Sequence, residues 1–154
     1  VMDLDRNPDE PIAFNLDSWA GYRTPRERLL RGLQQRKAGN VVVLTGDEHQ
    51  HYAGELHLDG RAPGREPIGI EFVATSISSG GNGQDQRPDM VRIQAANPQL
   101  KFNNSQRGYL MCDVTPERFE TRFRVLDQVQ ERGGKVSTRK TLAVPAGKAE
   151  LVEA

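Results

Sequence analysis

Two side chains that could bind a ligand or transfer a proton follow an apolar run in the first half of the chain. Residues 41–44 read VVVL, and the run breaks at Thr45 and Gly46 into Asp47 and His49. In open α/β sheets, ligands bind just beyond the carboxyl ends of the strands. A carboxylate and an imidazole can both bind metal ions, and histidine also titrates near neutral pH. The pattern therefore indicates a ligand site at a strand end, with Asp47 and His49 as its candidate groups.

The three histidines of the chain, His49, His51 and His57, fall within nine residues. In an extended segment His49 and His51 would share one face, because side chains alternate along a strand. Two histidines and an aspartate fit a metal site and fit partly exposed histidines at a strand end about equally well. His57 has polar neighbours in an alternating segment and is predicted to be solvated. The spacing by itself leaves both interpretations of His49 and His51 open.

Several common catalytic motifs are absent from the sequence. The chain has no HExxH, no paired CxxC, no GxSxG and no Walker motif, so zincins, zinc fingers, α/β-hydrolases and NTPases receive no support. The segment 76–83, SISSGGNG, could hold an anion on its backbone N–H groups. It lacks the lysine and the spacing of a nucleotide-binding loop, and it is predicted to be an ordinary connection.

A second polar cluster, KFNNSQRGY, occupies residues 101–109. Asparagine and serine favour turns because they hydrogen-bond to their own backbone. An asparagine carbonyl oxygen can also ligate a hard cation. The local sequence gives a turn and a ligand similar weight for Asn104, whereas Asn103 is the better candidate for a turn former.

The candidate site is expected to be carried by an αβ unit. A helix is predicted over residues 25–38, ended by Gly39. Its start has a cap, a first-position proline and a capping-box glutamate, at Thr24, Pro25 and Glu27. The strand 41–45 that follows is expected to be buried on both faces in the middle of a sheet, and Gly46 is expected to provide the sharp turn after it.

The rest of the chain changes from mixed elements to strands alone. Strands are predicted at 53–58 and 68–75, and a short helix at 89–96. Three strands then follow in direct succession, at 107–114, 118–129 and 136–144, and the tail after Pro145 is expected to fray. Strands joined by tight turns form an antiparallel meander. The predicted fold class is α/β, with an αβ unit followed by a mostly antiparallel β meander.

Composition narrows the choice of partners. The chain has 154 residues, with 21 basic and 21 acidic side chains, so no overall field attracts nucleic acid or an anionic membrane. No apolar run approaches the roughly 20 residues of a membrane helix. The single cysteine, Cys112, excludes an intrachain disulfide, and the first residues show no signal peptide. The hydrophobic content of 36% is low and fits a piece that packs against another segment.

Seven blocks in fixed order resemble one known family. They are DSWAGY, NVVVLTGDEH, FVATSISSGG, NPQLKFNNSQRGYL, VTPERFETRFRV and VSTRKTLAV, with the capped helix between the first two. The resemblance is to the C-terminal half of alkaline phosphatase D-type phosphatases, which belong to the calcineurin-like metallophosphoesterase group. It implies an α/β/β/α sandwich with a dinuclear centre containing iron and calcium. It also implies hydrolysis of phosphomonoesters and phosphodiesters, and export through the twin-arginine route.

The resemblance also implies roles for single residues. Asp47 matches the aspartate of the GDxH block and is expected to be a metal ligand. His49 matches the histidine of that block and is expected to be a metal ligand or a catalytic partner of the phosphate. Asn104 precedes the QRGY-like block and is expected to ligate the iron. This sequence departs from the family at Ala20, His51 and Tyr52, which bears on the shape of the pocket.

The family's upstream metal-binding blocks do not occur in this chain. Residues 1–154 are therefore expected to be the C-terminal portion of a single metallophosphatase domain, inactive alone. The parent enzyme is expected to hydrolyse a phosphoester substrate and to be periplasmic or secreted. The N-terminal half or another chain is expected to cover the sheet. The alternative is a non-catalytic scaffold or binding module that keeps the fold.

Overall fold

The computed structural model describes residues 1–7, 17–59 and 66–154 and contains two four-stranded sheets. Sheet A has the order β1-β3-β2-β4 and is made of β1 (Val42–Thr45), β2 (His51–Leu56), β3 (Gly69–Val73) and β4 (Leu100–Asn104). Sheet B has sequential order and is made of β5 (Gly108–Val114), β6 (Arg118–Leu126), β7 (Val136–Pro145) and β8 (Val152–Glu153). The helices are η1 (Trp19–Gly21), α1 (Arg23–Gln35) and α2 (Pro88–Ala96).

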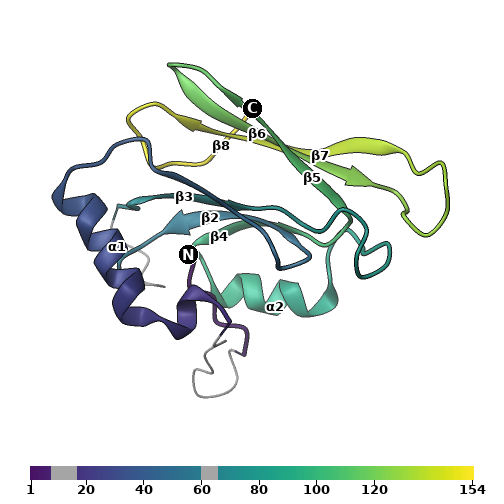
Figure 1. Cartoon of the computed structure of the whole chain (residues 1–154), viewed down its shortest axis with the longest axis horizontal. Helices are drawn as coiled ribbons and strands as arrows, with labels where there is room; N and C mark the ends of the chain where they lie inside the picture. Colours follow the sequence, from purple (N-terminus) through teal and green to yellow (C-terminus); the bar gives the residue numbers. More distant parts are fainter. Residues whose placement is uncertain (8–16, 60–65) are drawn as a thin grey trace.

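The two sheets pack face to face, and α1 and α2 lie on the side of sheet A away from sheet B (Figure 1). The core between the sheets is apolar and aromatic: Ala53, Ile70, Phe72, Phe123, Leu142 and Val144. A second cluster joins α2 to the outer face of sheet A: Tyr52, Val73, Met90, Ile93 and Leu100. All strand pairs of sheet B are antiparallel. The α/β fold class and the antiparallel meander are thus confirmed.

Strand β1 lies at the edge of sheet A, which differs from its expected central position. It pairs in parallel with β3 on one side, and the described residues place no strand on its other side. Leu44 is consequently 55% exposed. A continuous apolar run is typical of a strand that is buried on both faces. The run does not show whether the residues that bury it belong to the same stretch of chain.

The start and end of α1 also differ from the prediction. The N-cap residue is Tyr22, and no side chain caps the helix, so Thr24 does not form the expected capping box. The helix ends at Gln35, and the left-handed residue that follows is Lys37, at φ 51°, instead of Gly39. Arg26 is buried within α1 and donates hydrogen bonds to the carbonyls of Val1, His57 and Leu58, so the first turn is held by tertiary contacts.

Two segments that were expected to be irregular are strands. Asn103 and Asn104 lie in β4, which pairs with β2 through Tyr52↔Asn103 and His51↔Asn104. Val152 and Glu153, in the tail after Pro145, form β8 and pair with β7, so the end of the tail does not fray. In both cases pairing with a neighbouring strand outweighs the local preference of the residues for a turn or a coil.

Two of the three histidines are buried. His51 is 0% exposed and meets Phe123 edge to face at 5.3 Å between ring centroids, across the two sheets. His57 is 5% exposed and its Nε2 lies 3.1 Å from Glu55 Oε2, so it is not solvated as predicted. His51 begins β2, whereas His49 lies in the bend before it, and the two do not share a strand face. No helix among the described residues is long and apolar enough to cross a membrane.

We expect the neutral state of His51 to make the stability of the chain depend on acid. Burial lowers the pKa of His51 from 6.5 to about 4. Between these two pH values the unfolded state binds more protons than the folded state. The free energy of unfolding is therefore highest above pH 6.5 and decreases as the pH drops towards 4. The loss approaches about 3 kcal/mol. Urea unfolding from pH 7.5 to 4 should show this slope, and His51→Phe should flatten it. An equally steep slope in His51→Phe would assign the acid sensitivity to other groups.

Candidate functional site

The candidate site lies at the carboxyl edge of the β1–β3 pair. Because these strands are parallel, the loops that leave them emerge side by side. The N–H of Ala74, just after β3, donates to the carbonyl of Thr45 at the end of β1, at 2.9 Å. Asp47 and His49 follow β1, and the glycine-rich loop 76–83 follows β3. The predicted position of Asp47 and His49 at the end of their strand is therefore confirmed.

The backbone at Asp47 and His49 is left-handed. Their φ angles are 73° and 52°, a region that non-glycine residues seldom adopt. Gly46, which was expected to provide the turn, has no positive φ, and a Cβ there would meet Ala74 O at an ordinary 3.8 Å. Left-handed residues in a binding loop are a recurrent sign of a functional constraint. The turn is therefore made by the two candidate residues themselves.

Asp47 and His49 open on two neighbouring pockets, and Glu48 lines both. We call the first, of about 480 Å³, the Asp47 pocket, and the second, of about 390 Å³, the His49 pocket. Both side chains are exposed at the surface of the described chain. The prediction of one ligand site for Asp47 and His49 is thus met only in part, since the two groups are adjacent but line different cavities.

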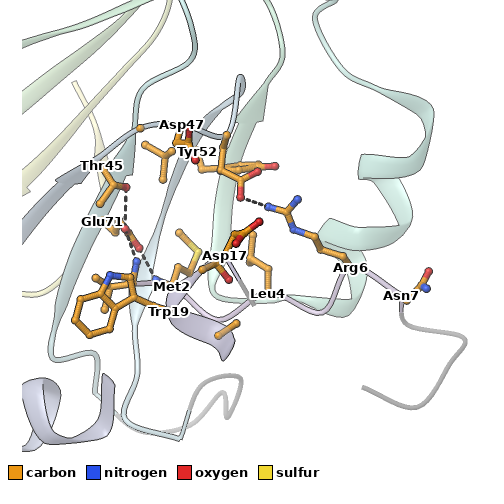
Figure 2. Close-up of a pocket in the computed structure, with 16 residues that line it drawn as sticks. Met2, Leu4, Arg6, Asn7, Asp17, Trp19, Thr45, Asp47, Tyr52 and Glu71 are labelled. Carbon is orange, nitrogen blue, oxygen red and sulfur yellow. Dashed lines mark hydrogen bonds and ion pairs between the residues drawn. The ribbon is translucent and has the colours of Figure 1, made fainter. Parts of the chain in front are cut away.

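The Asp47 pocket combines aromatic walls with a buried carboxylate (Figure 2). Glu71 is 1% exposed, accepts a hydrogen bond from Thr45 Oγ1 at 2.9 Å and accepts another from the Met2 N–H at 2.5 Å. Burial raises the pKa of Tyr52 to about 12, so its phenol stays protonated. Trp19 lines the pocket and is 40% exposed.

Arg107 lines the His49 pocket, a role that was not predicted from the sequence. Its guanidinium reaches three loop segments by donating to backbone carbonyls and to one serine hydroxyl. Arg107 had been noted only as part of a polar cluster. A signal in the sequence that could have identified it is its place in the polar cluster directly before the apolar strand that begins at Gly108.

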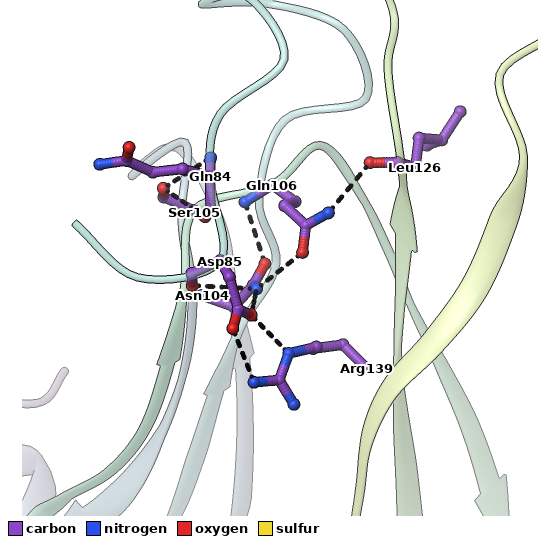
Figure 3. A network of polar contacts seen from close by, with 7 residues as sticks. All are labelled: Gln84, Asp85, Asn104, Ser105, Gln106, Leu126 and Arg139. Atoms are coloured by element: carbon purple, nitrogen blue, oxygen red, sulfur yellow. Dashed lines mark hydrogen bonds and ion pairs between the residues drawn. The ribbon is translucent and has the colours of Figure 1, made fainter.

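Asn104 lies in a separate polar network (Figure 3). Its Oδ1 accepts the Gln106 N–H at 2.9 Å, and its Nδ2 donates to Asp85 Oδ1 at 2.9 Å and to Gln106 Oε1 at 3.1 Å. Asp85 in turn pairs with Arg139 of β7, which lowers the pKa of the Asp85 carboxyl. Asn104 lines neither the Asp47 pocket nor the His49 pocket. The structure does not bring it together with those two residues, and its ligand role stays a prediction.

The donor atoms in the described residues are too few to enclose a metal ion. Within that part of the chain, no three histidine, cysteine, aspartate or glutamate side chains come close enough to share an ion. Asp47 and His49 offer one carboxylate and one imidazole, which suit hard and borderline cations. The described residues therefore fit a contribution to a metal centre but do not fit a complete one.

We expect the left-handed backbone to appear as a stability difference between two variants at position 47. At φ 73° a Cβ crowds the backbone, so Asp47→Gly should be more stable than Asp47→Ala by about 1 kcal/mol. Gly46→Ala is the matched control: it adds the same methyl group where φ is ordinary and should change stability by less than about 0.5 kcal/mol. Urea denaturation measures all three. Equal stabilities of the Gly and Ala variants at position 47 would contradict the assigned conformation.

Comparison with known proteins gives one consistent relationship. The family model of PhoD-like phosphatases matches residues 1–123. Alkaline phosphatase D of Bacillus subtilis (strain 168) is 44% identical over 126 residues, which cover 82% of this chain and 22% of that protein. A solved structure of PhoD matches with a TM-score of 0.94 and 37% identity, over 99% of this chain and 29% of that one. The chain thus spans less than a third of each relative and belongs to the PhoD-like phosphatase family.

Proposed function

We propose that this chain works as the C-terminal part of a phosphatase that hydrolyses phosphomonoesters or phosphodiesters with the help of bound metal ions. The observation that carries the proposal is the placement of Asp47 and His49 on a left-handed turn at the carboxyl edge of β1, in a chain of the PhoD-like phosphatase family. A left-handed backbone at non-glycine residues has a conformational cost, and such residues cluster at ligand-binding sites.

In this proposal Asp47 supplies a carboxylate to a dinuclear centre, with iron and calcium as the proposed metals. His49 either ligates a metal or hydrogen-bonds the phosphate as the catalytic partner. Bound ions of this kind neutralise charge on the phosphoryl group and lower the pKa of coordinated water. The ring of His49 and the carboxylate of Asp47 point into adjacent pockets, so one phosphoester could contact both sides of the turn.

The remaining metal ligands are proposed to come from the rest of the enzyme. Two donors do not define a coordination geometry, and incomplete ligand sets hold metal weakly. The open edge of β1 and the exposed side chain of Leu44 offer a surface where further chain can pair with sheet A. We also propose a periplasmic or secreted location for the whole enzyme.

The first test of function removes the two proposed ligands. In the full-length phosphatase, Asp47→Asn and His49→Asn should each lower kcat for an aryl phosphate by about 100-fold or more, because charge stabilisation of the reacting phosphoryl group is lost. Metal content, measured by mass spectrometry, should fall in Asp47→Asn. Glu150→Gln alters an exposed carboxylate in the C-terminal tail and serves as a control that should keep full activity.

The 154-residue chain alone provides the complementary measurement. It should hydrolyse no aryl phosphate and bind metal weakly, because it holds only part of the centre. Turnover by this chain, free of contaminating phosphatase, would contradict the proposed division of the site. If the full-length protein is well folded but inactive on all phosphoesters, the fold serves as a non-catalytic scaffold or binding module.

Asn104 is proposed as a third ligand through the second lone pair of its Oδ1, since one lone pair already accepts the Gln106 N–H. Asn104→Ala should then lower metal content and kcat together, in addition to a stability loss of about 1–3 kcal/mol from the buried network. Asn103→Ala is the matched control, because Asn103 is also buried and its Nδ2 donates to Gln50 Oε1 at 3.1 Å. Full metal content in Asn104→Ala would restrict Asn104 to the network of Figure 3.

A further inference from the structure

Arg107 is a buried cation whose two terminal nitrogens donate to neutral acceptors, while its Nε has no partner among the described residues. It is 3% exposed. Its Nη1 donates to Ser76 Oγ at 2.8 Å and to the Ser79 carbonyl at 2.6 Å. Its Nη2 donates to the His49 carbonyl at 2.9 Å and to the Ser105 carbonyl. One side chain therefore joins the bend after β1, the loop after β3 and the residues after β4.

This arrangement does not serve charge neutralisation. Within the described residues, the guanidinium forms no ion pair, and burying a cation without a carboxylate is costly. The guanidinium instead fixes the relative positions of these segments, because its planar donors reach several backbone carbonyls at once. Lysine carries the same charge but lacks this fork, so it cannot replace arginine here.

The contact of Arg107 with the candidate site is made at His49. The His49 carbonyl is held by Nη2, and the His49 ring lies against Gly80 of the opposite loop. A Cβ added at Gly80 would stand 3.4 Å from His49 Nδ1 and 3.2 Å from Arg107 Nη1, and the φ of Gly80 is 88°. The ring is exposed to solvent, but one side of it borders the loop that the same arginine ties to the His49 carbonyl.

The loop itself is fixed at its far end. Gly83 has a φ of 70°, and a Cβ there would lie 1.8 Å from the Ser105 carbonyl oxygen, so this position accepts glycine only. Asn82 reaches the β6–β7 hairpin by accepting the Val129 N–H at 2.8 Å and donating to Gln130 Oε1 at 3.1 Å. The glycine-rich segment is therefore tied at both ends, and two of its glycines, Gly80 and Gly83, stand at close contacts.

We propose that Arg107 is a positioning residue that holds the His49 ring in its working orientation through the His49 carbonyl and the loop that carries Gly80. The inference rests on the proposed phosphatase function, because that function assigns His49 a role as a metal ligand or as a partner of the phosphate. Arg107 itself contacts neither substrate nor metal in this role.

The test compares Arg107→Lys with Arg26→Lys in the full-length phosphatase. Arg26 is the matched control because it is equally buried and also donates to three backbone carbonyls, but it lines neither pocket of the site. Both variants should lower Tm by similar amounts. Arg107→Lys should lower kcat about 10- to 100-fold with KM within about threefold of wild type, because a displacement of about 1 Å at a catalytic group has an effect of this size. Arg26→Lys should keep kcat within about twofold.

A second variant covers the case in which Arg107→Lys does not fold. Gly80→Ala keeps the Arg107 side chain but adds a Cβ 3.2 Å from Arg107 Nη1 and 3.4 Å from His49 Nδ1. It therefore disturbs the Arg107–His49 contact from the loop side and should also lower kcat while sparing KM. Gly81→Ala is its control, because Gly81 also has a positive φ, of 73°, but a Cβ there meets nothing within 4 Å. A kcat in Gly80→Ala that equals the kcat of Gly81→Ala would overturn the proposal.

The position of His49 can also be measured without activity. The 154-residue chain has three histidines, so the Cε1–Hε1 NMR signals can be assigned with single His→Asn variants. Arg107→Lys should shift the His49 signal and leave the His57 signal in place. If His49→Asn keeps full phosphatase activity, the proposed function of His49 fails, while a shifted NMR signal still supports the contact. An unshifted His49 signal in folded Arg107→Lys would overturn the positioning role whatever the activity shows.

Discussion

The parallel pairing of β1 with β3 is the constraint on which the candidate site depends. It runs from Val42↔Ile70 to Thr45↔Val73 and places two strand ends at one edge of sheet A. The bend that carries Asp47 and His49 and the glycine-rich loop after β3 consequently meet, although about 30 residues of chain separate them. An antiparallel pairing of the same two strands would send these loops to opposite edges, and Arg107 could not reach both.

The site is built at the expense of local stability. Asp47 and His49 adopt left-handed backbone conformations, Arg107 is buried without a carboxylate partner, and the loop beside them needs glycines at close contacts. Each of these features opposes folding when it is taken alone. The apolar core between the two sheets and the strand pairing around it supply the stability that allows such features to persist.

The two pockets of the site differ in the chemical character of the residues that line them. The Asp47 pocket has aromatic walls and a buried, hydrogen-bonded carboxylate at Glu71. The His49 pocket is lined by arginine side chains and by the glycine-rich loop. In the proposed phosphatase, two adjoining pockets of different polarity would suit the anionic and organic parts of a phosphoester. The chain belongs to the PhoD-like phosphatase family and covers 22% of alkaline phosphatase D of Bacillus subtilis, which fits the proposal that other parts of the enzyme complete the site.

The sequence by itself determined the elements with strong local patterns. The αβ unit, the meander and the position of Asp47 and His49 after an apolar strand follow from periodicity and from turn residues, which act over a few neighbouring positions. The order of family blocks also gave the phosphatase relationship. Tertiary structure alone decided the rest. Asn103 and Asn104 became strand residues because β2 offered hydrogen bonds, and the tail became β8 because β7 did. The edge position of β1, the burial of His51 and the reach of Arg107 all depend on contacts between residues far apart in the chain, which no local pattern encodes.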